Sequence, residues 1–313
     1  MRTLDVIIPQ SEFKIDHHQP LALIGSCFSD EISSHFELNG FDTHSNPFGT
    51  IFHPSVIARF LNELCTGCLA ERIVLREDVW LSWDAGSGMY AMSEGEIKRK
   101  LSSERSKWRE LLSSASVLFI TFGTAWRYEL IESKLIVANC HKFSSGQFER
   151  AMSKAEDLLV EWKEVVKLLN RQFPDLKLVF TVSPVRHSKE GLVENNRSKA
   201  ELIRLVAELE QLNNCSYFPS YELVLDVLRD YRYFTQDLVH PSLEAVQFVW
   251  EKIESTYFDQ KTLELAKLVR QLKLSEEHRS LHPESKSSMD FRLNLGQKKQ
   301  QLLADFPFLK KWD

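Results

Sequence analysis

Two short segments near opposite ends of the chain carry the side chains best suited to nucleophilic chemistry. Gly25-Ser26-Cys27-Phe28 places a hydroxyl and a thiol side by side, and Asp237-Leu-Val-His240 places a carboxylate three residues before an imidazole. A carboxylate that accepts a hydrogen bond from one imidazole nitrogen leaves the other nitrogen free to take a proton from a nucleophile. Together the segments indicate a Ser-or-Cys/His/Asp site of the hydrolase type.

The first of these segments lies where a strand is expected to turn into a helix. Leu21-Ala-Leu-Ile24 is a short apolar run closed by Gly25, and the residues that follow have helical spacing through Phe36. A helix N-terminus offers free N–H groups and lowers the pKa of a thiol. Small residues that merely permit a tight turn explain the motif equally well, and an ordinary surface loop also explains Asp237-x-x-His240.

The rest of the chain alternates strand candidates with long amphipathic segments. The other strand candidates are 40–43, 117–121, 176–181 and 216–218. Two segments between them, 147–173 and 196–213, have the length and period of helices that cross over between parallel strands. This rhythm predicts an α/β fold: a three-layer α/β/α sandwich around a flavodoxin-like, five-stranded parallel sheet.

Two insertions and a tail complete the expected organisation. Residues near 70–92 and 128–138 have the alternation of β-hairpins, and the chain beyond residue 260 is helix-forming and mixed in charge. We expect a single α/β domain over residues 1–260, with a helical C-terminal extension over 261–313 packed on its core.

Composition excludes several classes of partner. The chain has 44 acidic and 39 basic residues spread along its length, so no basic stripe is available for nucleic acid. Met1–Gln10 lacks the pattern of a secretory signal, and no run approaches the ~20 apolar residues that span a bilayer. An odd count of five cysteines favours reduced thiols. We therefore expect a cytoplasmic protein without nucleic-acid or membrane partners.

No metal or cofactor is expected either. Cys65-Thr-Gly-Cys68 lacks a second Cys-x-x-Cys or a nearby histidine pair to complete four ligands, and the chain has no glycine-rich phosphate loop.

Five segments, taken in chain order, resemble a known plan: 24–29, 46–50, 122–126, 139–142 and 230–242. The plan is that of the SGNH or GDSL hydrolase superfamily and, within it, of the GSCFA-domain family. The resemblance implies a three-layer α/β/α fold with a hydrolase-like site. It also implies that Asp237 is the orienting carboxylate and His240 the general base.

The resemblance leaves the nucleophile and the oxyanion donor open. The superfamily motif is Gly-Asp-Ser, so Cys27 falls at the place of the nucleophile and Ser26 at that of the aspartate; a turn shifted by one residue would make Ser26 the nucleophile. The superfamily's Gly-x-Asn corresponds to Gly123-Thr124-Ala125, which lacks the amide donor. Asn46, or the backbone N–H groups of Gly49 and Cys27, would have to replace it.

The remaining candidates would contact substrate. His141 follows the second expected hairpin and could point into the cleft, although a solvated loop histidine is an equally good interpretation. His187 and Arg186 follow a strand end and could bind an anionic group. The sequence thus predicts an esterase or acyl-transfer enzyme for a small or carbohydrate-linked ester. The alternatives are a thiol-based transferase and a non-catalytic binding or scaffold protein that retains the fold.

Overall fold

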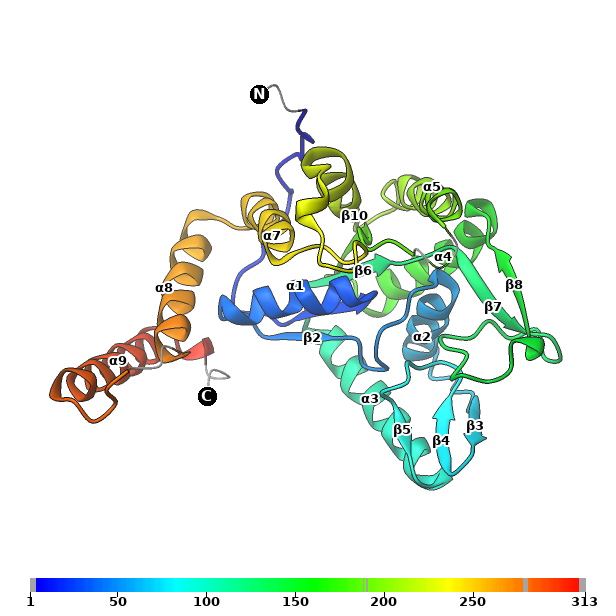
Figure 1. Cartoon of the computed structure of the whole chain (residues 1–313), viewed down its shortest axis with the longest axis horizontal. Helices are drawn as coiled ribbons and strands as arrows, with labels where there is room; N and C mark the ends of the chain where they lie inside the picture. The colour runs from blue at the N-terminus through cyan, green and yellow to red at the C-terminus, as the bar shows by residue number, and fades with distance from the viewer. Residues whose placement is uncertain (1–3, 188, 190, 278–280, 310–313) are drawn as a thin grey trace.

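The computed structural model describes residues 4–187, 189, 191–277 and 281–309, with a five-stranded parallel sheet at its centre (Figure 1). The strand order is β10-β9-β6-β1-β2. The strands are β1 (Leu21–Gly25), β2 (Thr43–Ser45), β6 (Val117–Phe122), β9 (Lys177–Val182) and β10 (Cys215–Tyr217). All neighbouring pairs are parallel, which confirms the predicted flavodoxin-like sheet.

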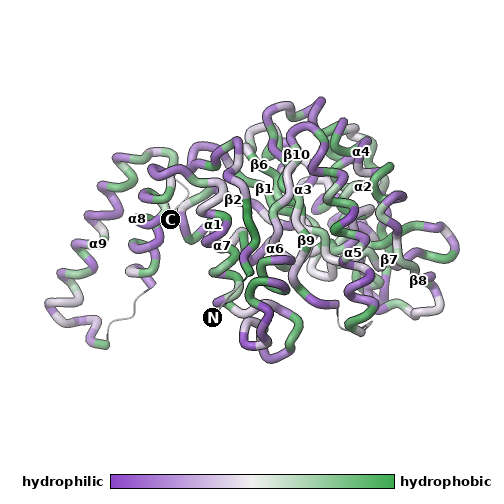
Figure 2. The backbone as a smooth tube through the Cα atoms, turned by 90° about the horizontal axis from the view of Figure 1, so that it is seen from above, coloured by the Kyte–Doolittle hydropathy of each residue, from purple (hydrophilic) through white to green (hydrophobic). Residues whose placement is uncertain are grey.

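The central strands are apolar without interruption because helices cover both of their faces. Alternate residues of each strand enter different cores: Ile24 and Ile120 join one cluster, whereas Leu23 and Phe119 join the other. Figure 2 shows this apolar chain in the middle of the domain. Burial on both faces fixes the register, since a slip of one residue would exchange the two faces.

Two helical layers enclose the sheet. The layer on the Ile24 side consists of α2 (Pro54–Thr66), α3 (Glu94–Ser114), α4 (Ala155–Gln172) and α5 (Leu192–Leu209). The opposite layer consists of α1 (Cys27–Leu38), the short α6 (Ser220–Glu222), the π-helical turn η3 (Leu223–Leu228) and α7 (Leu243–Tyr257). The predicted three-layer sandwich is therefore correct.

Two small antiparallel sheets interrupt the parallel one. The first, β3 (Ile73–Arg76), β4 (Val79–Ser82) and β5 (Tyr90–Ala91), lies within the expected insertion near 70–92. The second contains the expected turn near 128–138, with one antiparallel bridge between Glu129 and Ile136, but its main ladder is with a later segment. A tight turn follows β7 (Trp126–Leu130), where Leu130 N–H donates to the Leu135 carbonyl at 2.9 Å, but the long ladder of β7 is with β8 (Phe148–Met152).

That pairing corrects the predicted helix over 147–173. Its first residues form β8, after the single turn η1 (Ser145–Gln147), and α4 begins only at Ala155. The predicted helix over 196–213 is α5, shifted towards the N-terminus by four residues at each end, from 196 to 192 and from 213 to 209.

The C-terminal extension has two helices, α8 (Gln260–Glu277) and α9 (Lys286–Asp305), and the turn η5 (Pro307–Leu309). Val269 on α8 packs against Gly40, so α8 lies on the domain, whereas α9 leads outwards beside α8 (Figure 1). No helix among the described residues combines the length and apolarity needed to cross a membrane.

Candidate active site

The turn between β1 and α1 is fixed by a glycine that no other residue can replace without strain. Gly25 has φ +136°, and a Cβ added to it would lie 2.1 Å from the Thr121 carbonyl oxygen on β6. The absence of a side chain therefore lets the backbone at Gly25 approach β6 closely. Ser26 N–H donates to the same Thr121 oxygen at 3.1 Å. This close approach places the start of α1 at the carboxyl edge of the sheet, where open α/β sheets bind ligands.

The two candidate nucleophiles have different environments. Ser26 is 1% exposed, and its hydroxyl caps α1 by accepting from Phe28 N–H at 3.3 Å. Cys27, the first residue of the helix, is half-buried and lines a cavity of about 860 Å³, which we call the site cavity. Ser26 is not among the described residues that line it. The geometry therefore favours Cys27.

His240 lines the same cavity, on a loop built around Asp237. The Asp237 Oδ2 atom lies 2.7 Å from His240 Nδ1, so the carboxylate holds that nitrogen protonated and leaves Nε2 as the proton acceptor. The other oxygen of Asp237 accepts from the Thr235 hydroxyl at 2.6 Å and from the N–H groups of Val239 and His240 at 2.8 and 3.0 Å. These bonds hold the pKa of Asp237 well below its usual value.

The loop after β9 fastens the histidine loop to the sheet. Arg186 N–H donates to the Val239 carbonyl at 3.1 Å, and its guanidinium donates to the Leu238 carbonyl at 3.3 Å. The same guanidinium lies 4.0 Å from the centre of the Phe234 ring. Sequence reasoning suggested Arg186 as an anion ligand; the structure shows that it also supports the His240 loop.

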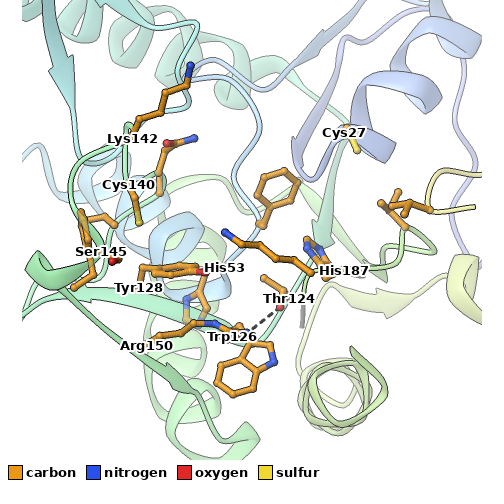
Figure 3. Close-up of a pocket in the computed structure, with 18 of the residues that line it drawn as sticks. Cys27, His53, Thr124, Trp126, Tyr128, Cys140, Lys142, Ser145, Arg150 and His187 are labelled. Carbon is orange, nitrogen blue, oxygen red and sulfur yellow. Dashed lines mark hydrogen bonds between the residues drawn. The ribbon is translucent and has the colours of Figure 1, made fainter. Parts of the chain in front are cut away.

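The site cavity lies between the sheet edge and the second hairpin. In the view of Figure 3, Cys27 stands at one side and Tyr128, Cys140 and Ser145 at the other. A volume of about 860 Å³ is within the range of small-molecule sites, roughly 300–1,000 Å³. Thiol and imidazole thus face one substrate-sized space, although they come from opposite ends of the sequence.

The Cys27 thiol is protonated at rest. Burial raises its pKa, and the nearby Asp30 carboxylate raises it further, against the smaller opposing effect of the N–H groups at the start of α1. A nucleophile in this environment requires a base to take its proton during attack. His240 can act as that base in the same cavity.

Asn46 and Gly49 are committed to other bonds. Asn46 Oδ1 accepts from Gly25 N–H at 2.8 Å, and its amide nitrogen donates to Asp30 Oδ2 at 2.9 Å. Gly49 N–H donates to the Asn46 carbonyl at 2.9 Å. Neither residue is among the described lining of the site cavity, so both support the Gly25 turn from behind. Of the donors that the sequence suggested, the Cys27 N–H is the one that lies at the cavity.

The Gly123-Thr124 segment directly follows β6 and brings Thr124 to the cavity. The N–H groups of both residues donate to the Phe52 carbonyl, at 2.9 and 3.1 Å, so they are unavailable to an oxyanion. The Thr124 side chain lines the cavity and is hydrogen-bonded to Ser198 at 3.0 Å. Thr124 is thus brought to the site, whereas Gly123 permits close contact with Phe52, whose side chain would lie 2.9 Å from an added Cβ.

His141 does not share the site cavity. Its ring is 3% exposed, Nε2 donates to the Ser82 carbonyl at 2.7 Å, and burial lowers its pKa. It lines a separate, smaller cavity of about 310 Å³ beside β4. The structure therefore does not bring His141 together with Cys27 and His240.

Two other histidines line the site cavity. His53 Nδ1 accepts from Ser55 N–H at 3.1 Å, so its proton is on Nε2, which points at Ser153 Oγ 3.0 Å away. This tautomer cannot take a proton from Ser153, and the pair is structural. His187 packs edge-on against Phe52, and burial lowers its pKa to about 4, so it is a neutral ring beside the site.

The comparison with protein families decides the relationship of this chain to known proteins. The model of the GSCFA family matches residues 20–253, a span that holds both the Cys27 turn and the His240 loop. The chain belongs to the GSCFA family. No curated protein matches it.

Several solved esterases are distantly similar to this GSCFA chain. A carbohydrate esterase family 3 protein from Talaromyces cellulolyticus is 9% identical, with 80% of this chain and 98% of that chain covered and a TM-score of 0.37. A family two carbohydrate esterase from Clostridium thermocellum, in complex with cellohexaose, is 11% identical, with 80% and 64% covered and a TM-score of 0.39. An acetyl xylan esterase from Butyrivibrio proteoclasticus is 10% identical, with 76% and 63% covered and a TM-score of 0.38.

Sequence reasoning missed one pair of residues on α5. Ser198 accepts from Ala125 N–H at 2.7 Å, and Lys199, 1% exposed, donates to the carbonyls of Gly123 and Ser183 at 2.7 Å each. The signal was present in the periodicity, because Lys199 lies three residues before Leu202 on the buried face of an amphipathic helix. The pair joins the ends of β6 and β9 beneath the cavity.

No group of three or more histidine, cysteine, aspartate or glutamate side chains with metal-binding geometry occurs in the described part of the chain.

Proposed function

We propose that this GSCFA-family protein is an acyl hydrolase that cleaves an ester through a Cys27-His240-Asp237 site. The observation that carries the proposal is that Cys27 and His240, a histidine already oriented by the Asp237 carboxylate, both line one substrate-sized cavity. A scaffold that had lost its chemistry has no need for the Asp237 bond that fixes the tautomer of an exposed imidazole.

The proposed reaction has two halves. His240 Nε2 takes the proton of Cys27 as the sulfur attacks the ester carbonyl, and the tetrahedral intermediate collapses to a thioester when the alcohol leaves with that proton. Water then attacks the thioester, again losing its proton to His240. The acid departs, and the sulfur recovers a proton from the imidazolium.

The developing oxyanion would be held at the start of α1. The Cys27 N–H lies beside its own sulfur at the positive end of the helix, where a negative charge is stabilised. The superfamily's amide donor has no counterpart at Ala125, which is buried and whose N–H bonds to Ser198. We therefore expect slower turnover than a site with a complete set of donors.

The hairpin wall of the cavity suits a sugar ring. Trp126, Tyr128, Phe143 and Phe148 line it, and flat aromatic faces pack against the apolar face of a pyranose. A carbohydrate-linked ester is the substrate class that this wall supports best. The same thioester would transfer its acyl group to an added alcohol if water were excluded.

The test is turnover of acetylated sugars and aryl acetates by the wild-type protein and by Cys27→Ala and His240→Ala. We expect hydrolysis that both substitutions abolish, and an acyl adduct on the Cys27 peptide in mass spectra of quenched reactions. Hydrolysis that persists in both variants, or an adduct on Ser26, would overturn the assignment. Acyl transfer to methanol, scored in the same assay, separates the hydrolase from the transferase.

A further inference from the structure

The site cavity has a charge opposite to that of the chain as a whole. Lys142, Arg150, Arg186 and Lys189 line it, and no aspartate or glutamate occurs among the described residues that do so. The whole chain, in contrast, has a net charge of −5. A concave wall with one sign of charge concentrates ligands of the other sign.

The groups that contact the Arg186 guanidinium are uncharged. The guanidinium donates to the Leu238 carbonyl at 3.3 Å, and its carbon lies 4.0 and 5.2 Å from the ring centres of Phe234 and Tyr231. Rings and a carbonyl hold the guanidinium in place without cancelling its charge.

Lys142 is held at the rim by a strained loop. His141 and Lys142 both have left-handed backbones, with φ of 48° and 59°, a conformation that costs non-glycine residues about 1–3 kcal/mol each. Three hydrogen bonds hold the first of them: Asn139 Oδ1 accepts from His141 N–H at 2.7 Å, Arg76 donates to the His141 carbonyl at 2.8 Å, and His141 donates to Ser82.

This loop explains what the buried His141 does. Its ring is hydrogen-bonded to Ser82 at the end of β4, in the first insertion. The next residue, Lys142, is exposed and lines the site cavity. The strained backbone therefore places a lysine beside the hairpin wall of the cavity. Figure 3 shows Lys142 on the same side as Cys140, across the cavity from Cys27.

We infer that the site cavity selects substrates that carry an anionic group, a carboxylate or a phosphate, on the molecule that bears the ester. The inference rests on the proposed function for the ester, but the anion subsite itself requires no turnover. Lys142 and Lys189, from the loops after β7 and β9, bind the anion, while the hairpin wall packs against the ring that carries it. An acidic sugar that is acylated on a hydroxyl combines these features.

Binding of unreactive ligands to the full chain tests the subsite separately from the chemistry. The probes are methyl glucuronoside, methyl glucoside and glucose phosphate, titrated by calorimetry at low and high salt. We expect the two anionic sugars to bind and the neutral one to bind at least about tenfold more weakly, with the difference shrinking as salt increases. The stronger of the two anionic probes identifies carboxylate or phosphate as the preferred group.

Three lysine variants complete the experiment. Lys142→Met and Lys189→Met should each weaken binding of the preferred anion by about tenfold and leave methyl glucoside unchanged. Lys107→Met, on the exposed surface of α3, removes the same charge far from the cavity and should change neither. Equal affinity for the neutral and anionic sugars, or equal loss in all three variants, overturns the subsite.

Turnover by the same proteins separates this inference from the proposed function. Anion binding without hydrolysis of any acetylated sugar would refute the esterase and uphold the subsite. Hydrolysis of acetylated methyl glucoside as fast as of acetylated methyl glucuronoside would uphold the esterase and refute the subsite.

Discussion

Lys199 donates a hydrogen bond to the carbonyl oxygen of Gly123 at 2.7 Å and a second one, equally short, to that of Ser183. Its side chain is 1% exposed and extends from α5 to the ends of two neighbouring strands. A neutral amine has two protons, which is the number these carbonyls use. Complete burial accordingly lowers the pKa of Lys199 to about 7.

The titration of Lys199 predicts a pH dependence of stability. Its ordinary pKa is 10.5, so between about pH 7 and 10.5 the unfolded chain binds a proton that the folded chain lacks. Stability from this group therefore increases with pH across that window, by at most about 1.4 kcal/mol per unit, and is lost as pH falls towards 7.

Urea denaturation between pH 7 and 9 tests this prediction, with Lys199→Met as the reference. The difference in the free energy of unfolding between wild type and variant should change with pH in the stated direction, because other titrating groups are common to both proteins. A difference that stays constant over this range would mean that Lys199 remains charged in the folded state.

Substitution of the two adjacent nucleophile candidates should separate folding from chemistry. Ser26→Ala removes the helix cap and should cost about 1 kcal/mol of stability while hydrolysis continues. Cys27→Ala should abolish hydrolysis with little loss of stability, since the thiol only lines the cavity. Chemical denaturation and turnover, measured on both variants, provide the comparison, and the reverse pattern would restore the serine assignment.

The raised pKa of Cys27 predicts slow alkylation. Iodoacetamide reacts with the thiolate, so at neutral pH the Cys27 peptide should be labelled more slowly than that of the exposed Cys68. Asp30→Asn removes the neighbouring carboxylate charge and should increase the labelling rate at a given pH. Peptide mass spectrometry over a pH series measures both sites in one sample. Faster labelling of Cys27 than of Cys68 at neutral pH would show a resting thiolate.

Asp237→Asn tests the tautomer. The variant keeps a side-chain oxygen for the N–H groups of Val239 and His240, but its amide would donate to His240 Nδ1 and move the imidazole proton to Nε2. An Nε2 that carries a proton cannot accept one from Cys27, so kcat should fall at least about a hundredfold with the fold intact. Circular dichroism checks the fold, and near-normal turnover would refute the role of Asp237.

The parts of the site that the sequence predicted are those held by local rules. Asp237 and His240 are three residues apart in one loop, and Cys27 follows directly from an apolar strand and a glycine. The parallel sheet was predictable for the same reason, because runs such as Val117–Phe122 are apolar on both faces.

What the sequence did not predict depends on contacts between distant segments. The sequence predicts a helix where β8 lies, because the partner strand β7 is some twenty residues earlier and only the ladder between the two makes the segment extended. Asn46 has the composition of an oxyanion donor, but Gly25 and Asp30 occupy its amide. The helical periodicity predicts that Lys199 lies on a buried face, but it does not indicate that the carbonyls of Gly123 and Ser183 accept its hydrogen bonds.

The Gly25 turn makes the strongest prediction about stability. Gly25→Ala adds a Cβ 2.1 Å from the Thr121 carbonyl oxygen, at a φ of +136° that side chains rarely adopt. Relief would require β1 to separate from β6 in the middle of the sheet, so we expect a loss of about 4 kcal/mol or more, or an insoluble protein. Gly296→Ala, in α9 with nothing within 4 Å of the added carbon, is the matched control and should stabilise by about 0.5–1 kcal/mol. Thermal and urea unfolding of both variants measure the difference, and a well-folded Gly25→Ala protein that still hydrolyses its ester would show that this turn does not set the position of Cys27.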